Sequence, residues 1–102
     1  TNIKVLILKL LNAHHLDATS VMALEELLEN FKKKDCHVLL CGIRKDVLRI
    51  FRDSGVLSRM NRLNIFPHSH KNPTLATARA VKRAKELLKV KPKVKIFSVE
   101  KE

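Results

Sequence analysis

Asp17, Thr19 and Ser20 are the residues of this sequence whose types and spacing are best suited to chemistry. They lie in the stretch Leu16-Asp17-Ala18-Thr19-Ser20, between an apolar strand and an amphipathic helix that we expect to begin at Val21. Any modification or regulation placed there would sit at the positive end of a helix dipole. Residues of these types also serve as ordinary helix caps, which is the structural alternative.

The histidines and cysteines show no metal-binding spacing. The candidates are His14, His15, Cys36, His37, Cys41, His68 and His70. No Cys-x-x-Cys or His-x-x-x-His pattern occurs among them, and Cys36 and Cys41 lie five apart on a strand, so they should face opposite sides of a sheet. The chain also has no Gly-rich phosphate loop, no Gly-x-Ser-x-Gly motif and no paired carboxylates beyond helix-surface glutamates. We therefore predict a reduced protein that binds no metal and is not an enzyme.

A second candidate site is the run Gly42-Ile43-Arg44, in which Gly42 is expected to make a tight turn. Like Asp17-Ala18-Thr19, it lies where a strand leads into a helix. Open parallel sheets bind ligands at this carboxyl edge. The alternative is a pair of ordinary strand-to-helix turns, because neither run contains a phosphate-binding glycine pattern.

The chain is strongly basic, with a formal net charge of +11 over 102 residues. Residues 1–70 hold eleven Lys and Arg against seven Asp and Glu, whereas residues 71–102 hold ten against three. The candidate basic surface comprises Arg79, Lys82, Arg83, Lys85 and Lys89. It is either a solvated helix face or a contact for anionic lipid headgroups or an acidic protein. Nucleic acid is a less suitable partner, because the chain has four Phe and no Tyr or Trp for base stacking.

Hydrophobic periodicity predicts strands and helices in alternation. We expect strands at 3–8, 37–41 and 63–66, and helices from Val21, over 45–54 with Gly55 ending it, and after Asn72-Pro73. The last helix should bury a stripe of Leu75, Ala78, Val81, Ala84 and Leu88, with Arg79, Lys82 and Arg83 facing solvent. Residues 94–99 form either a fourth strand or a basic tail. This order predicts an α/β fold with a small, mainly parallel sheet in βαβαβα order and an extra C-terminal edge strand.

The ordered set of elements resembles the STAS domain, the sulfate transporter and anti-sigma-factor antagonist module. The resemblance is carried by Val5-Leu6-Ile7-Leu8, Leu16 to Ser20 with Ala23 to Leu27, Val38 to Gly42, Val47 and Phe51 before Ser54-Gly55, Asn64-Ile65-Phe66 and Leu75-Ala76. It covers roughly residues 3–88 and is greatest to the C-terminal domain of sulfate permeases of the SulP type. Two features depart from the family pattern: Ser20 stands where glycine is common, and two strands and a helix expected before Ile3 are missing.

The resemblance implies a cytoplasmic regulatory module, attached to the inner face of the membrane through the transmembrane domain of an anion transporter. Residues 1–90 would form an N-terminally truncated domain, and residues 91–102 a basic tail or a strand that pairs with an exposed edge, in the same molecule or in a homodimer. Thr19 aligns with the phosphorylated hydroxyl of the anti-sigma-factor antagonists, so a free-standing antagonist is the alternative function, and a basic nucleic-acid-binding domain is a third. No cofactor is expected, although nucleotide binding has been proposed for some family members. An acyl carrier protein is an acidic partner that the family allows.

Overall fold

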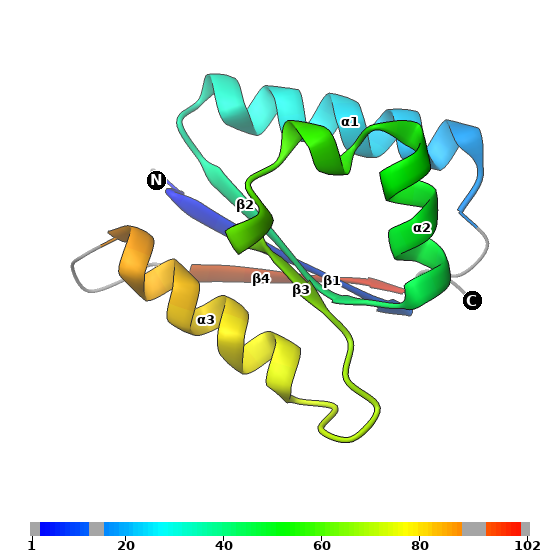
Figure 1. Ribbon diagram of the computed structural model, residues 1–102. Coiled ribbons are helices and arrows are strands. Elements are labelled where there is room, and N and C mark those ends of the chain that lie inside the picture. Colours follow the sequence, from blue (N-terminus) through cyan, green and yellow to red (C-terminus); the bar gives the residue numbers. More distant parts are fainter. Residues whose placement is uncertain (1–2, 13–15, 89–93, 101–102) are drawn as a thin grey trace.

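The computed structural model describes residues 3–12, 16–88 and 94–100. Its elements are β1 (Val5–Asn12), α1 (Ala18–Lys33), β2 (His37–Ile43), α2 (Lys45–Ser54), β3 (Ile65–Pro67), α3 (Leu75–Leu88) and β4 (Val94–Glu100). The four strands form one sheet in the order β3-β2-β1-β4, and every neighbouring pair is parallel (Figure 1). The predicted α/β fold class and the additional C-terminal edge strand are confirmed.

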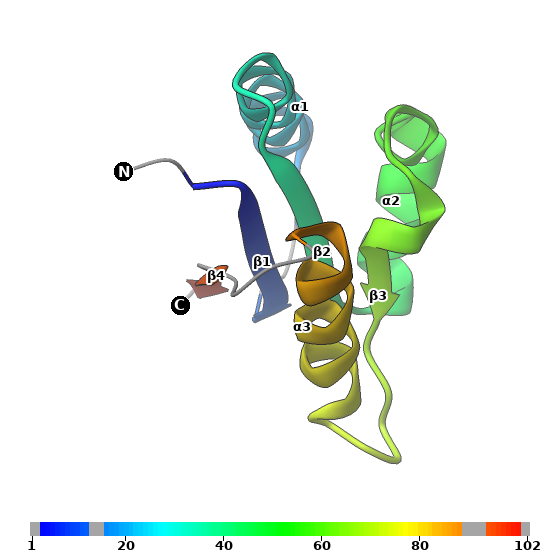
Figure 2. The ribbon, with the colours of Figure 1, turned by 90° about the vertical axis from the view of Figure 1, so that its left-hand side faces the viewer.

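The helices cover the two faces of the sheet unequally. Figure 2 shows α1 and α2 on one face and α3 on the other. This division follows from the alternation of side chains along each strand. In β1, Leu6, Leu8 and Leu10 pack toward α1 and α2, whereas Val5 and Ile7 pack toward α3. Because both faces are covered, the central strands are apolar on both sides, as the sequence indicated.

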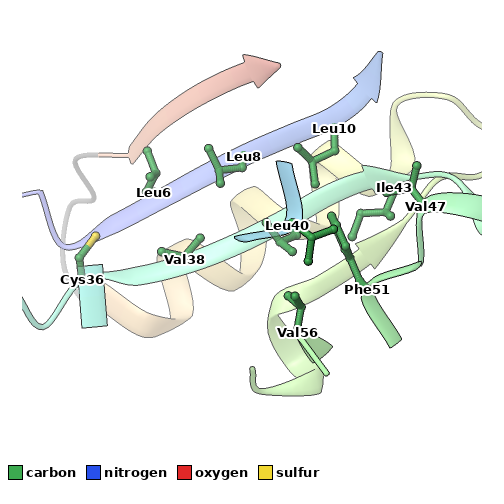
Figure 3. Close-up of a cluster of buried hydrophobic side chains, with 11 residues drawn as sticks. Leu6, Leu8, Leu10, Cys36, Val38, Leu40, Ile43, Val47, Phe51 and Val56 are labelled. Carbon is green, nitrogen blue, oxygen red and sulfur yellow. The ribbon is translucent and has the colours of Figure 1, made fainter. Parts of the chain in front are cut away.

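The larger core lies under α1 and α2 (Figure 3). Phe51 and Val47 of α2 are each 1% exposed and pack with Leu40 and Ile43 of β2. The predicted bounds of α2 are confirmed, and Gly55 ends the helix in the left-handed conformation with φ +87°. The chain then folds back, so that Val56 is fully buried in the same core.

The smaller core lies between the sheet and α3, and here the predicted stripe was right only in part: Ala84 is buried, and Val81 and Leu88 are half-buried and pack against this core. The buried residues of α3 are Ala76, Ala80 and Ala84, four positions apart, whereas Leu75 is half-buried and Ala78 is exposed. The alanine row packs against Val5, Ile7, Leu39 and Cys41 of the two central strands, so α3 contacts the sheet through its smallest side chains. Cys41 lies in this core and Cys36 in the other, so the two cysteines face opposite sides of the sheet as predicted.

Two strand ends differ from prediction. Gly42 makes no tight turn, because β2 continues through it to Ile43 with φ +72° at Gly42 and a register shift against β3. This is the geometry of a β-bulge, in which a residue with positive φ is accommodated inside a strand. The third strand starts at Ile65 rather than residue 63, because Arg62–Asn64 forms a 3-10 turn capped by the Asn61 side chain.

The segment 94–100 forms β4 and lies along β1, in register from Val5 opposite Val94 to Leu8 opposite Phe97. Of the two alternatives for residues 94–99, a strand or a basic tail, the structure has the strand, and it pairs within the same molecule. Ile96 of this edge strand is 46% exposed. None of the helices in the described part of the chain is long and apolar enough to cross a membrane.

Candidate functional site

Helix α1 begins at Ala18, three residues earlier than predicted. Asp17 is its N-cap, and the Asp17 Oδ1 atom accepts a hydrogen bond from the Ser20 backbone N–H at 2.8 Å. The Val21 N–H donates to the Asp17 carbonyl oxygen at 3.0 Å, which closes the first helical turn. Ala18, Thr19 and Ser20 are therefore helical rather than part of a loop. The capping alternative thus describes Asp17 well, because its side chain satisfies a backbone donor at the helix start.

Thr19 occupies the first turn of α1 with its side chain exposed, whereas Ser20 is half-buried. Of the two hydroxyls, that of Thr19 is thus the more accessible to a modifying enzyme. A phosphate there would add about −1.5 to −2 charge. The positive end of the helix dipole would stabilise this charge without requiring the helix to change.

Thr19 lies beside an apolar side chain that faces solvent. Met22 is 68% exposed, one turn further along α1. The two residues line a broad hollow of about 590 Å³ together with Ala23, Glu25 and Glu26. A single exposed apolar side chain is common on protein surfaces, but a methionine in a hollow can adapt its shape to a partner, so this position is a candidate contact. We call these five residues the α1 surface.

Sequence reasoning did not identify Met22 as an exposed apolar residue, although a signal was present. The apolar positions Val21, Leu24 and Leu28 of α1 face the sheet, and Met22 lies outside that stripe. A large apolar residue at a helix position that should face water is the pattern that could have identified it.

The second candidate, Gly42-Ile43-Arg44, is largely occupied by the chain itself. Ile43 is 1% exposed and belongs to the core. The Ile43 carbonyl oxygen accepts the His68 N–H at 2.9 Å. Arg44 is half-buried, and its Nε donates to the Leu11 carbonyl oxygen at 3.0 Å. These bonds join the ends of β1, β2 and β3, so the three residues have a clear structural role at this edge.

Two histidines lie near the same edge. The rings of His68 and His70 stack edge to face with centroids 5.0 Å apart. The Nδ1 atom of His68 is buried and has no hydrogen-bond partner. Within residues 3–12, 16–88 and 94–100, no three His, Cys, Asp or Glu side chains come together in a way that could hold a metal ion.

The cysteines are poor nucleophiles. Burial raises the pKa of the Cys36 thiol, and the charge of Lys4 opposes this effect only in part. Burial also raises the pKa of the Cys41 thiol, opposed by a hydrogen bond with Thr77 and the charge of Lys9. Because the thiolate is the reactive form, both side chains are suited to packing rather than to covalent chemistry.

The residues of the predicted basic surface do not all lie on one exposed face. Arg79, Lys82 and Lys85 are exposed on α3, and Lys89 lies outside the described residues. Arg83 does not face solvent as predicted: its Nε donates to the Oδ1 atom of Asn64 at 3.0 Å. Asn64 is a buried polar residue, 9% exposed, in the turn before β3. Arg83 therefore ties α3 to that turn, a contact between segments that no helical pattern could reveal.

The comparisons with known proteins support one family. A family model described as the STAS domain matches residues 1–72, which include β1, α1, β2, α2 and β3. No curated protein and no solved structure gave a significant match to the chain.

Proposed function

Because this chain belongs to the STAS domain family, we propose that it is a regulatory module that docks a partner protein through the α1 surface. The observation that carries this proposal is the exposure of Thr19 and Met22 together, one turn apart at the start of α1. Met22 supplies an apolar anchor of the kind that contributes most to binding energy. Thr19 supplies a position at which added charge would change binding without altering the fold.

The acidic side chains of the α1 surface determine how such a switch would act. Glu25 and Glu26 already make the surrounding potential negative, although Glu25 is partly neutralised by Arg59 Nη1 at 3.2 Å. Phosphorylation of Thr19 would add further negative charge next to Met22. Phosphorylation would thus weaken the binding of a partner that buries Met22, because the phosphate would have to be desolvated on docking.

Our more specific proposal is that the chain is the cytoplasmic C-terminal module of a sulfate-permease-type anion transporter, and that its partner is the transmembrane domain of that protein. The resemblance to this branch of the family and the basic charge of +11, suited to the neighbourhood of an anionic membrane, support it. Ser20, in place of the glycine common in antagonists, gives further support.

The alternative is a free-standing anti-sigma-factor antagonist that is switched by phosphorylation of Thr19. One specific observation favours it: the hydroxyl-bearing Thr19 side chain is exposed directly after the capping residue Asp17. In this function the α1 surface would bind a kinase, and phosphorylation would release it.

The native polypeptide distinguishes the transporter proposal from the antagonist alternative. Its intact mass and sequence, determined after separation of membrane and soluble fractions, should reveal a membrane-bound protein with about ten or more apolar spans, each of about 20 residues. A small protein recovered from the soluble fraction would contradict the transporter proposal. Phosphorylation of that protein at Thr19 by an anti-sigma kinase, with Thr19→Val as the control, would then support the antagonist.

A further inference from the structure

The outer face of α2 carries a cluster of cations that the proposed docking surface does not use. Lys45, Arg49 and Arg52 are exposed, and they line a groove of about 290 Å³ with the half-buried leucines Leu48 and Leu57. We infer that this groove binds the phosphate-bearing headgroup of an anionic phospholipid, and we call its five residues the α2 groove. The inference goes beyond the proposed function, because it concerns another helix and another ligand.

The spacing of the three cations makes them converge. At 100° per residue, Lys45, Arg49 and Arg52 lie within a sector of about 60° on the helix surface. Leu48 lies beside them, about 40° from Arg52. The three charges span two helical turns. Lys45 and Arg49, four residues apart, repel each other, and only Arg52, in the last turn, is placed favourably for the helix dipole. A bound phosphate would turn this repulsion into attraction.

Local carboxylates do little to neutralise the cluster. Asp46 and Asp53 are the acids of α2, and both lie to one side of the cation sector, about 80° to 100° from Lys45 and about 40° to 60° from Arg49. Arg52 Nε contacts Asp53 Oδ1 at 3.4 Å, but both side chains are 67% exposed, so the pair is weak. Within the described part of the chain, Lys45 and Arg49 have no carboxylate within ion-pair distance.

The size and lining of the groove favour a lipid headgroup over other anions. A volume near 290 Å³ is at the lower end for ligand sites, enough for a phosphate with its glycerol but not for an acyl chain. The two leucines would remain against water if inorganic phosphate bound, whereas the glycerol and the start of the acyl region would cover them. A nucleic acid would gain no base stacking here, because none of the five residues of the α2 groove is aromatic.

The chain provides a matched control on its opposite face. Arg79, Lys82 and Lys85 of α3 are also three exposed cations, but successive members are displaced by about 60° around the helix, so they spread rather than converge. Figure 2 shows α2 and α3 on opposite sides of the sheet. The variants Lys45→Gln/Arg49→Gln/Arg52→Gln and Arg79→Gln/Lys82→Gln/Lys85→Gln remove the same net charge from different faces.

The experiment is co-sedimentation of the chain with vesicles of equal parts phosphatidylglycerol and phosphatidylcholine, at physiological salt. We expect the α2 triple variant to bind roughly 100-fold more weakly than wild type, and the α3 triple variant to bind within about threefold of wild type. Circular dichroism verifies the fold of each variant. The single variant Arg49→Gln, whose affinity for the vesicles should fall about fivefold, gives the same information if the triple variant unfolds.

Other outcomes would overturn the inference. Equal losses in the two triple variants would show that only net charge matters, and an unchanged α2 variant would exclude the groove. Displacement of the chain from vesicles by millimolar inorganic phosphate, which lacks the glycerol, would show that the ligand is a soluble phosphate. If duplex DNA binds the wild type as tightly as the vesicles do, and the α2 triple variant loses this binding, the groove is a general polyanion site. The Thr19→Glu variant should bind vesicles like wild type. A failure of the lipid proposal can therefore be told apart from a failure of the α1 docking proposal.

Discussion

At the scale of single residues, the start of α1 contains one residue with a structural role and two with accessible side chains. Asp17 caps the helix through the Ser20 N–H, whereas Thr19 and Met22 direct accessible side chains outward. The sequence placed Asp17, Thr19 and Ser20 in one turn, and their roles became distinct only when the helix start was known. The contact of Arg83 with Asn64 joins segments distant in sequence and could not be predicted, whereas the exposure of Met22 could have been inferred from its position outside the apolar stripe of α1.

Arg83 provides a residue-scale prediction. Arg83→Met should leave the buried Oδ1 atom of Asn64 without its donor and reduce the free energy of unfolding by about 1–3 kcal/mol. Arg79→Met, on the exposed face of the same helix, is the control and should change it by no more than about 0.5 kcal/mol. Urea unfolding monitored by circular dichroism measures both. Equal effects would show that the Asn64 contact contributes nothing.

The buried thiols provide a pH-dependent prediction. Burial raises the pKa of Cys36 and Cys41 above the ordinary value of 9.0, so the folded chain holds the thiol protons more tightly than the unfolded chain. Stability from this source is fully present below pH 9 and is lost as pH rises through the higher folded pKa. Urea unfolding at about pH 8 and about pH 10 should therefore show a decrease that is smaller in the Cys36→Ala/Cys41→Ala variant. An identical decrease in the two proteins would refute this account.

At the scale of elements, α1 should tolerate negative charge at its start. Thr19→Glu places a carboxylate in the first turn, next to the positive end of the helix dipole, and should raise the free energy of unfolding by about 0.3–1 kcal/mol. Thr19→Lys should lower it by a similar amount. Thermal unfolding of both variants is the measurement. A destabilised Thr19→Glu variant would mean that a phosphate at this position disturbs the helix itself.

The edge strand β4 provides a second prediction at this scale. Because Val94–Glu100 pairs with β1, its backbone amides should exchange with deuterium more slowly than in the urea-unfolded chain. The central strands β1 and β2 should be protected still more strongly, since each has two strand neighbours. Exchange of residues 94–100 at the unfolded rate would contradict the pairing.

At the scale of the whole molecule, the alternation of elements was predictable because it depends on local hydrophobic periodicity. The bounds of α2 followed from its apolar face and from Gly55. The rotation of α3 about its axis was predicted only in part, because the row Ala76, Ala80 and Ala84 faces the sheet and the helical pattern identified only Ala84 of these three. The sequence also did not determine which strand β4 pairs with, because pairing between distant segments depends on the tertiary structure. The three-dimensional arrangement adds that the α1 surface and α3 lie on opposite sides of the sheet.

The central claim is that the α1 surface docks a partner, and one binding measurement tests it most directly. For the partner that the transporter proposal names, the transmembrane domain of the same protein, the dissociation constant is measured with wild type, Met22→Glu and the control Leu63→Glu, since Met22 is 68% and Leu63 62% exposed. We expect Met22→Glu to weaken binding at least about tenfold, the loss of a single anchor residue, and Leu63→Glu to bind like wild type. Equal affinity of all three proteins would contradict docking through the α1 surface.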